Sequence, residues 1–110
     1  MESPRPARFL VIYNPTAGRR RRRRLSAGLA ALDRAGIAVD LVRTPGPDDA
    51  ERLAAEAGPG VDMVVVAGGD GTINGAINGL MARAAAGRAV PPLGILPLGT
   101  ANVLAAELGM

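Results

Sequence analysis

The sequence predicts a doubly wound, Rossmann-like α/β fold, in which a parallel sheet carries helices on both faces in the order β-α-β-α-β-α-β-α. Short apolar runs alternate with segments whose apolar residues recur at helical spacing. The connections between them are a few residues long, which favours right-handed crossovers between parallel strands. Residues 61–67 are almost wholly apolar, as expected for a central strand that is covered on both faces.

The first strand and helix are predicted at residues 9–13 and about 19–35. Residues 9–13 are apolar with adjacent β-branched side chains, and they stop at an Asn-Pro pair that favours a turn. Gly36 follows the helix where a C-terminal glycine cap is expected. The apolar face of the helix is formed by leucines one turn apart: Leu25, Leu29 and Leu32.

The second strand and helix are predicted at residues 37–42 and 47–57. Alternating apolar residues mark the strand, which ends near Thr44. Pro47 suits a first helical position, and acidic residues follow it in the first turn, where the helix dipole favours them. The predicted apolar stripe of this helix comprises Ala50, Leu53, Ala54 and Ala57.

The third strand, residues 61–67, leads directly into a glycine-rich turn and a helix that frays after residue 84. A short strand at 93–97 and a terminal helix at 103–108 complete the pattern. The predicted buried face of the third helix comprises six residues at helical spacing: Ile73, Ala76, Ile77, Leu80, Met81 and Ala84.

Composition excludes several classes of chemistry. The 110 residues suffice for one small domain, and they include no Cys, His or Lys. Disulfides, thiolate zinc sites, imidazole bases, P-loop lysines and Schiff-base enzymes are therefore excluded, so carboxylates must perform any acid-base work. No apolar run is long enough to span a membrane, and residues 1–8 do not resemble a signal peptide. We therefore expect a cytoplasmic protein.

The net charge of +3 comes from one place, because six of the 13 arginines are consecutive, at 19–24. Elsewhere seven arginines face ten carboxylates. The run could gather nucleotide or anionic lipid head groups, or it could form a solvated, partly frayed helix end. With one Tyr and one Phe, base stacking has little support, and we expect no nucleic-acid partner.

Three turns follow strands of the predicted sheet, at 14–18, 68–72 and 98–102, and parallel strands bring such turns to one edge. In the turn at 68–72, glycines let backbone N–H groups approach a phosphate, and the following helix adds its positive dipole end. The alternative is a tight structural turn that Asp70 or Thr72 caps. A dinucleotide fingerprint would need glycines at 69, 71 and 74, but residue 74 is Asn.

Polar residues around these turns have two interpretations each. Asp70 would repel phosphates unless it holds magnesium, a magnesium-bound water or backbone N–H groups, and otherwise it stabilises the turn. Asn74 is close enough to reach a ligand, whereas Asn78 is expected to cap or face solvent. Thr44 and Thr100 could serve a phosphate or ribose, or cap a helix.

Three blocks resemble the catalytic domain of the diacylglycerol kinase family, in its bacterial lipid-kinase branch, to which sphingosine kinases are related. They are Asn14-Pro-Thr-Ala-Gly18, Gly68-Gly-Asp-Gly-Thr-Ile-Asn74 and Leu96-Pro-Leu-Gly-Thr-Ala-Asn102, and the resemblance covers nearly the whole chain. The middle block is shared with NAD kinases and is similar to phosphofructokinases. The third block favours lipid kinases.

The resemblance implies a kinase that uses ATP and Mg²⁺ to phosphorylate a lipid hydroxyl, such as that of diacylglycerol or a sphingoid base. Its lipid acceptor would lie at a membrane surface, so peripheral contact with the inner membrane face is also expected. Asp70 is the candidate for reaching magnesium, through a water. The nucleotide-binding residues that the resemblance implies are Thr44, Gly68, Gly69, Asp70, Gly71, Thr72, Ile73, Asn74 and Thr100, with Asn14, Gly99 and Asn102 beside them.

Two departures from the family pattern qualify this expectation. Gly75 stands where the family usually has Glu, which removes a carboxylate from the site. Family members also have a second, β-rich domain with the catalytic base, so residues 1–110 are expected to be the nucleotide-binding half, incomplete for catalysis alone. The alternative is a non-catalytic nucleotide-binding module or a truncated remnant. An uncovered sheet edge or helix face could also drive homo-oligomer formation.

Overall fold

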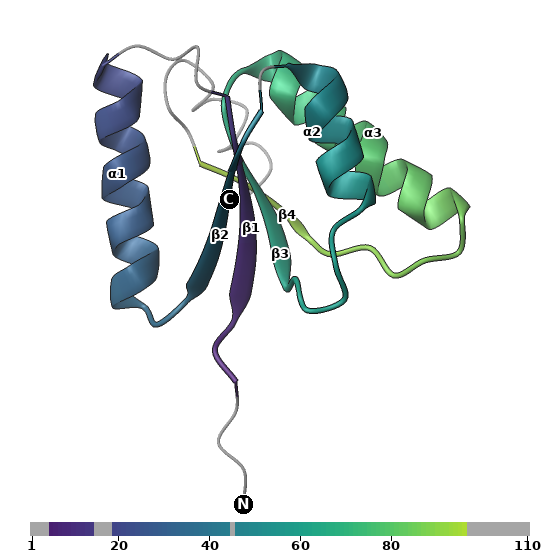
Figure 1. Cartoon of the computed structure of the whole chain (residues 1–110), viewed down its shortest axis with the longest axis horizontal. Coiled ribbons are helices and arrows are strands. Elements are labelled where there is room, and N and C mark those ends of the chain that lie inside the picture. The colour runs from purple at the N-terminus through teal and green to yellow at the C-terminus, as the bar shows by residue number, and fades with distance from the viewer. Residues whose placement is uncertain (1–4, 15–18, 45, 97–110) are drawn as a thin grey trace, which may run out of the picture.

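A computed structural model describes residues 5–14, 19–44 and 46–96, apart from the side chains of residues 19–21 and 47. Four parallel strands form one sheet in the order β2-β1-β3-β4 (Figure 1). Helix α1 lies on one face of the sheet, and α2 and α3 lie on the other. The predicted doubly wound α/β fold is confirmed. The strands are β1 (Arg8–Tyr13), β2 (Ala38–Arg43), β3 (Met63–Ala67) and β4 (Leu93–Ile95); the helices are α1 (Arg19–Arg34), α2 (Pro47–Ala55) and α3 (Asp70–Ala85).

The predicted elements among these residues are confirmed, with small shifts at their ends. Strand β3 begins at Met63 instead of residue 61, because the Val61 N–H donates to the Gly58 carbonyl in a turn. Gly36 ends α1 with a φ of 78°, a conformation that glycine adopts without strain. The predicted helix at 103–108 lies outside the described residues. No helix in the described parts of the chain is long and apolar enough to cross a bilayer.

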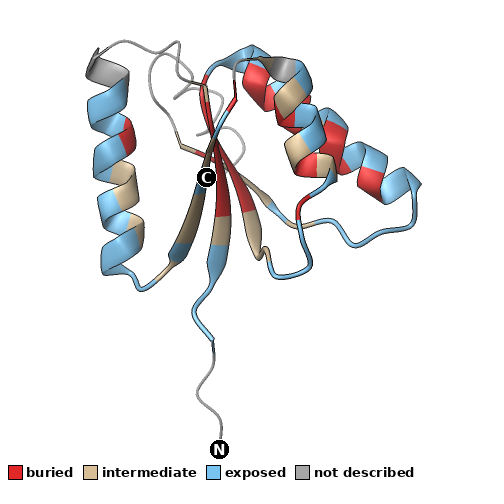
Figure 2. Ribbon diagram, in the orientation of Figure 1, coloured by how far each residue is buried: buried red, intermediate tan, exposed pale blue. Residues whose placement is uncertain are grey.

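The larger hydrophobic core lies between the sheet and the α2–α3 layer (Figure 2). Leu10 and Ile12 of β1 and Val64 and Val66 of β3 point into it, which matches the alternation of a strand. The predicted stripe of α2 is confirmed, with Leu53 half-buried and the three alanines buried. The buried members of this core are Leu10, Ile12, Ala50, Ala54, Ala57, Val64, Val66, Ile73, Ala76, Leu80 and Ile95.

A smaller core lies between the sheet and α1. Of the three predicted leucines of α1, Leu25 is buried, while Leu29 and Leu32 are half-buried and pack against the same cluster. The buried members are Val11, Tyr13, Leu25, Val65 and Ala67. Both faces of β1 and β3 are therefore covered, as predicted for the central strand at 61–67.

The predicted buried face of α3 is wrong at Met81 and Ala84. Met81 is 64% exposed, and Ala84 is also exposed. Gly79 and Arg83 are buried instead, because α2 crosses α3 on its small-residue side. A Cβ on Gly79 would lie 2.2 Å from the Glu51 carbonyl oxygen, so the two helix backbones approach more closely than any side chain at this position would allow.

Arg83 ties the two helices together at the C-terminal end of α2. Its Nη1 donates to the carbonyl oxygens of Ala55 at 3.0 Å and Ala57 at 2.8 Å, and its Nε donates to that of Ala89 at 3.0 Å. These acceptors include carbonyls at the negative end of the α2 dipole, where a cation is favoured.

Ion pairs tie the N-terminal segment to the end of the sheet at which the strands begin. Arg5 forms a bidentate contact with Asp62, with both N–O distances at 3.0 Å, and Arg8 pairs with Asp40 at 2.9 Å. The hydrogen bond from Arg5, followed by that from the Arg8 backbone N–H, holds the pKa of Asp62 below its usual range. This edge therefore gains pH-dependent contacts far from the carboxyl ends of the strands.

Candidate functional site

The candidate site is built where β1, β2 and β3 end. The Asn14 N–H donates to the Ala67 carbonyl at 3.2 Å, and the Thr44 N–H donates to the Tyr13 carbonyl at 2.8 Å. These bonds extend the ladder beyond the strands and bring Asn14, Thr44 and the glycine-rich turn to one edge. The predicted convergence is thus found for these segments. The turn at 98–102, with Gly99, Thr100 and Asn102, lies outside the described residues, as do residues 15–18.

The glycine-rich turn joins β3 to α3 with an open helix N-terminus. Gly69 is the N-cap residue, with extended backbone angles (φ −93°, ψ −172°) and no side-chain cap. The capping alternative for Asp70 and Thr72 is therefore wrong. The Ile73 N–H makes the first helical hydrogen bond, to the Gly69 carbonyl at 3.1 Å. The N–H groups of residues 70–72 belong to the helical turn that has no intrahelical acceptors, which is the arrangement that binds anions.

The glycines of this turn have two different roles. A Cβ on Gly68 would lie 3.1 Å from Thr72 Oγ1 and 3.4 Å from Asn14 Cβ, so close packing of the turn requires Gly68. A Cβ on Gly69 or Gly71 would meet nothing within 4 Å. Packing among the described residues therefore does not explain Gly69 and Gly71. Glycine at these two positions would let a ligand approach the backbone closely.

Asn14 and Thr72 link β1 to α3 beneath the turn. Asn14 Nδ2 donates to Thr72 Oγ1 at 3.4 Å, and Thr72 is only 2% exposed. Ile73 is buried in the α2–α3 core. The side chains of Thr72 and Ile73 thus support the turn from within, and any nucleotide contact from these two residues would come through the backbone.

Thr44 lies at the same edge, but its side chain is fully buried. Its Oγ1 donates to the Gly46 carbonyl at 2.8 Å and accepts from the Gly46 N–H at 3.4 Å. In this structure the hydroxyl holds the turn between β2 and α2. Contact of Thr44 with a nucleotide stays a prediction.

Asp70 and Asn74 lie one turn apart on α3, and both are exposed. Asn78 is exposed as well, which agrees with the prediction that it faces solvent. The described residues contain no group of three metal-ligating side chains. Magnesium is commonly held by one or two carboxylates together with substrate phosphates and water, and Asp70 fits that role at the start of α3.

The edge formed by the C-terminal ends of the strands, here called the carboxyl edge, also includes a basic residue that the sequence motifs did not single out. Arg43 ends β2, is paired in register with Tyr13, and is exposed. Paired residues of parallel strands share a face of the sheet, so Arg43 lies on the α1 side. Strand alternation was the signal that could have placed it there.

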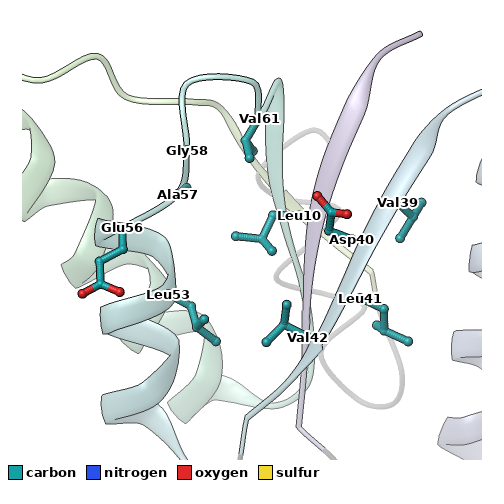
Figure 3. Close-up of a pocket in the computed structure, with 10 residues that line it drawn as sticks. All are labelled: Leu10, Val39, Asp40, Leu41, Val42, Leu53, Glu56, Ala57, Gly58 and Val61. Carbon is teal, nitrogen blue, oxygen red and sulfur yellow. The ribbon is translucent and has the colours of Figure 1, made fainter.

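A groove of about 620 Å³ opens elsewhere, between β2 and α2 (Figure 3). Its described lining is mainly aliphatic, with the carboxylates of Asp40 and Glu56 and no basic side chain. Of the predicted nucleotide-binding residues that the structure describes, none lines it. Because carboxylates repel phosphates, this groove does not suit a nucleotide, and the glycine-rich turn remains the candidate site.

Comparisons with known proteins converge on one family. A family model described as the diacylglycerol kinase catalytic domain matches residues 8–110. A diacylglycerol kinase of Bacillus subtilis (strain 168) is 39% identical over 105 residues, which cover 94% of this chain and 33% of that protein. One from Staphylococcus saprophyticus is 38% identical over 97 residues, covering 86% of this chain and 30% of that protein.

The fold is shared with solved structures. The crystal structure of a diacylglycerol kinase from Bacillus anthracis str. Sterne matches with a TM-score of 0.70 and 30% identity, over 97% of this chain and 38% of that one. The chain thus spans about a third of the length of the curated relatives that it matches.

Proposed function

Because this chain belongs to the diacylglycerol kinase catalytic domain family, we propose that it supplies the ATP-binding part of a lipid kinase. In the proposed reaction, the γ-phosphoryl group of ATP passes to a lipid hydroxyl, such as that of diacylglycerol or a sphingoid base. The O–P bond to the β-phosphate breaks as the new ester bond forms, and the hydroxyl proton leaves to a base. The proposed nucleotide-binding residues are those predicted from the sequence.

One observation carries this proposal, namely the open backbone at Gly69 and Gly71. Among the described residues, nothing beyond the chain neighbours and the helix's own backbone lies within 4 Å of the Cβ position of either residue, and the N–H groups of the first α3 turn belong to the same segment. A phosphate chain placed there would accept hydrogen bonds from backbone N–H groups and interact with the positive end of the helix dipole. Asn14 and Thr72 would keep the turn in place from below.

Magnesium and ATP are proposed together. Asp70 is exposed on the first turn of α3, and it is the carboxylate nearest in sequence to the open backbone. We propose that it reaches a phosphate-bound Mg²⁺ through a water, because a bare carboxylate would otherwise repel the phosphates. Positioning and metal electrostatics supply most of the catalysis of phosphoryl transfer. We therefore expect residues 1–110 alone to bind ATP and to phosphorylate lipid slowly or not at all.

The experiment is calorimetric titration with Mg-ATP of the wild type, Gly69→Ala and Gly71→Ala, with thermal unfolding of each. A methyl group at either position would fill the proposed ligand space and, within the described part of the chain, would meet no packed neighbour within 4 Å. ATP affinity should therefore fall at least ten-fold with little change in the unfolding midpoint. Gly60→Ala is the matched control, because its Cβ also meets nothing and it lies at the other end of β3. Wild-type affinity in both turn variants would refute the site.

Asp70→Asn tests the magnesium contact separately. The variant should bind ATP without Mg²⁺ at least as well as the wild type, because a repelling charge is gone, and should lose the enhancement that Mg²⁺ gives. Equal Mg²⁺ dependence in both proteins would remove Asp70 from the metal site.

A second candidate function is nucleotide binding without catalysis, favoured by Gly75. This residue is buried within α3, where the family usually has Glu. ATP binding without turnover by the longest reading frame that contains this sequence would support the second function. Labelling of diacylglycerol by that protein would exclude it.

A further inference from the structure

The two outer strands of the sheet differ in how well they are protected. The order β2-β1-β3-β4 leaves β2 and β4 with one neighbouring strand each among the described residues. Strand β4 has three residues, with Gly94 in its middle. Strand β2 has six residues and no proline, and its register with β1 runs unbroken from Ala38 to Arg43. Short strands, prolines and bulges protect a sheet edge from pairing with another chain, so β2 is the less protected strand.

The outer edge of β2 carries backbone groups that β1 does not use. The N–H groups of Ala38 and Thr44, at the two ends of the strand, both donate at 2.8 Å to carbonyl oxygens of the β1 segment. Hydrogen-bonding groups of successive strand residues point to alternate sides, so those of the odd-numbered residues point away from β1. Among the described residues these outward groups have no backbone partner. They belong to Val39, Leu41 and Arg43.

Apolar side chains accompany these backbone groups on both faces of β2. Leu41 is 44% exposed on the α1 side, opposite to the direction of Val42 (Figure 3). On the other face, Val42 and Leu53 point into the groove of about 620 Å³ between β2 and α2. Residues 39–42 all line that groove, so the strand edge and the groove form one continuous surface.

The outer edge of β2 is complementary to itself. When two copies of β2 run antiparallel about a two-fold axis at Leu41, the outward groups of the two Leu41 residues face each other. Those of Val39 then face those of Arg43 in the second copy. Each of these pairs exchanges two hydrogen bonds, so every outward backbone group of the strand is satisfied. Two-fold contacts of this kind are the commonest way in which identical chains associate.

The charges of β2 are compatible with this register. Its charged residues, Asp40 and Arg43, lie opposite valines of the second copy, so no like charges are directly opposite each other. The Asp40 carboxylate is already paired with Arg8 at 2.9 Å. A register centred on Asp40 would bring two carboxylates face to face, and one centred on Val42 would pair fewer backbone groups. Leu41 is therefore the favoured centre.

We propose that β2 binds a second copy of this chain, antiparallel and centred on Leu41, so that the two sheets join into one. The two Leu41 side chains would cover each other on the α1 side. Because the joined strands run in opposite directions, the glycine-rich turns of the two copies would lie at opposite ends of the joined sheet. The contact uses no residue of the glycine-rich turn, so this inference does not rest on the proposed function.

The experiment is sedimentation equilibrium of the wild type, Leu41→Lys and Met81→Lys over a range of protein concentrations, without nucleotide. Met81→Lys is the matched control, because Met81 is 64% exposed on α3. The wild type should show a monomer–dimer equilibrium. Leu41→Lys should weaken the dimer about ten-fold or more, because two lysines would face each other and two leucines would lose their cover. Met81→Lys should keep the wild-type dissociation constant.

The register is tested with an introduced thiol, because the chain has no cysteine of its own. In a hydrogen-bonded pair of antiparallel residues the Cα atoms lie about 5.5 Å apart, a separation that a disulfide can span. Leu41→Cys should therefore form a covalent dimer when it is oxidised with diamide. Met81→Cys should stay monomeric on a denaturing gel under the same conditions.

Three results would overturn the inference. The first is a wild type that stays monomeric at every concentration. The second is an equal loss of dimer in Leu41→Lys and Met81→Lys, which would reflect charge alone. The third is a dimer in which Leu41→Cys forms no disulfide, which would assign the contact to another surface. Circular dichroism shows whether each variant is folded, and the cross-linking result decides the matter if Leu41→Lys is not.

Discussion

The two helical layers are attached to the sheet in different ways. On one face, the backbones of α2 and α3 are in close contact at Gly79, which has no side chain to keep them apart. Arg83 of α3 also donates hydrogen bonds to carbonyl oxygens at the C-terminal end of α2. On the other face, α1 contributes one buried leucine and two half-buried ones, and its first turns consist of arginines. The first layer positions the glycine-rich turn, whereas the second presents charge to the surroundings.

We expect the largest loss of stability from Gly79→Ala in the α2–α3 layer. Gly28→Ala in α1 is the matched control variant. A Cβ at residue 79 meets the Glu51 carbonyl oxygen at 2.2 Å and Ala54 Cβ at 2.9 Å, and backbone cannot move aside cheaply. We expect a loss of roughly 2 to 4 kcal/mol in the free energy of unfolding, measured by urea titration.

Gly28→Ala should cost far less. Its Cβ would meet Leu96 Cδ1 at 2.7 Å, the far end of a flexible side chain, and alanine favours helix. We expect a change within about 1 kcal/mol of the wild type. Similar losses for the two variants would show that the layers are equally tightly packed.

A smaller loss is expected from Arg83→Met. Its guanidinium donates three hydrogen bonds to carbonyl oxygens, and the variant leaves these acceptors without it. The free energy of unfolding should fall by about 1 to 3 kcal/mol, measured by the same titration. Arg88→Met is the control, because Arg88 is exposed and donates one bond, to Ala55 at 3.1 Å. If both variants lose the same free energy of unfolding, the burial of Arg83 contributes nothing to stability.

In the α1 layer we expect a substitution to stabilise the protein instead of destabilising it. The variant Arg22→Gln/Arg23→Gln/Arg24→Gln removes repulsion between arginines one turn apart and between cations and the helix dipole, so it should stabilise the protein by about 0.5 to 1 kcal/mol. The difference from the wild type should shrink in 0.5 M NaCl, as thermal unfolding at two salt concentrations would reveal. Destabilisation would indicate that these arginines make contacts within the fold.

The smallest expected effect is a pH-dependent change in stability. It arises at the end of the sheet where the strands begin, away from both helical layers. Since the Arg5 and Arg8 contacts lower the pKa of folded Asp62, its contribution to stability is present above the unfolded-state value, about 3.9, and is lost as pH falls through the folded value. Asp62→Asn should therefore lower the urea midpoint at pH 7, and its difference from the wild type should shrink as the pH falls below the unfolded-state value. A constant difference at all pH values would remove Asp62 from the acid response.

Much of the fold followed from local patterns. The strand at 9–13 and the leucine spacing of α1 were apparent because burial on one face leaves a period in the sequence. The placement of Asn14 and the glycine-rich turn at one edge followed from parallel connectivity. The buried face of α3 followed at Ile73, Ala76, Ile77 and Leu80. It was wrong at Met81 and Ala84, because the residues buried near them, Gly79 and Arg83, do not look like core residues.

The sequence by itself determined the order of the elements, the glycine-rich turn at the end of β3 and the charge of α1, because these depend on residues that are adjacent or one turn apart. Only the tertiary structure decided that Gly68 fills a packing role while Gly69 and Gly71 stay open. It also decided that Thr44 bonds to Gly46, and that Arg83 bonds to the carbonyl oxygens of Ala55 and Ala57. The space around a backbone atom, and the partner of a buried side chain, depend on segments that can lie far apart in the chain.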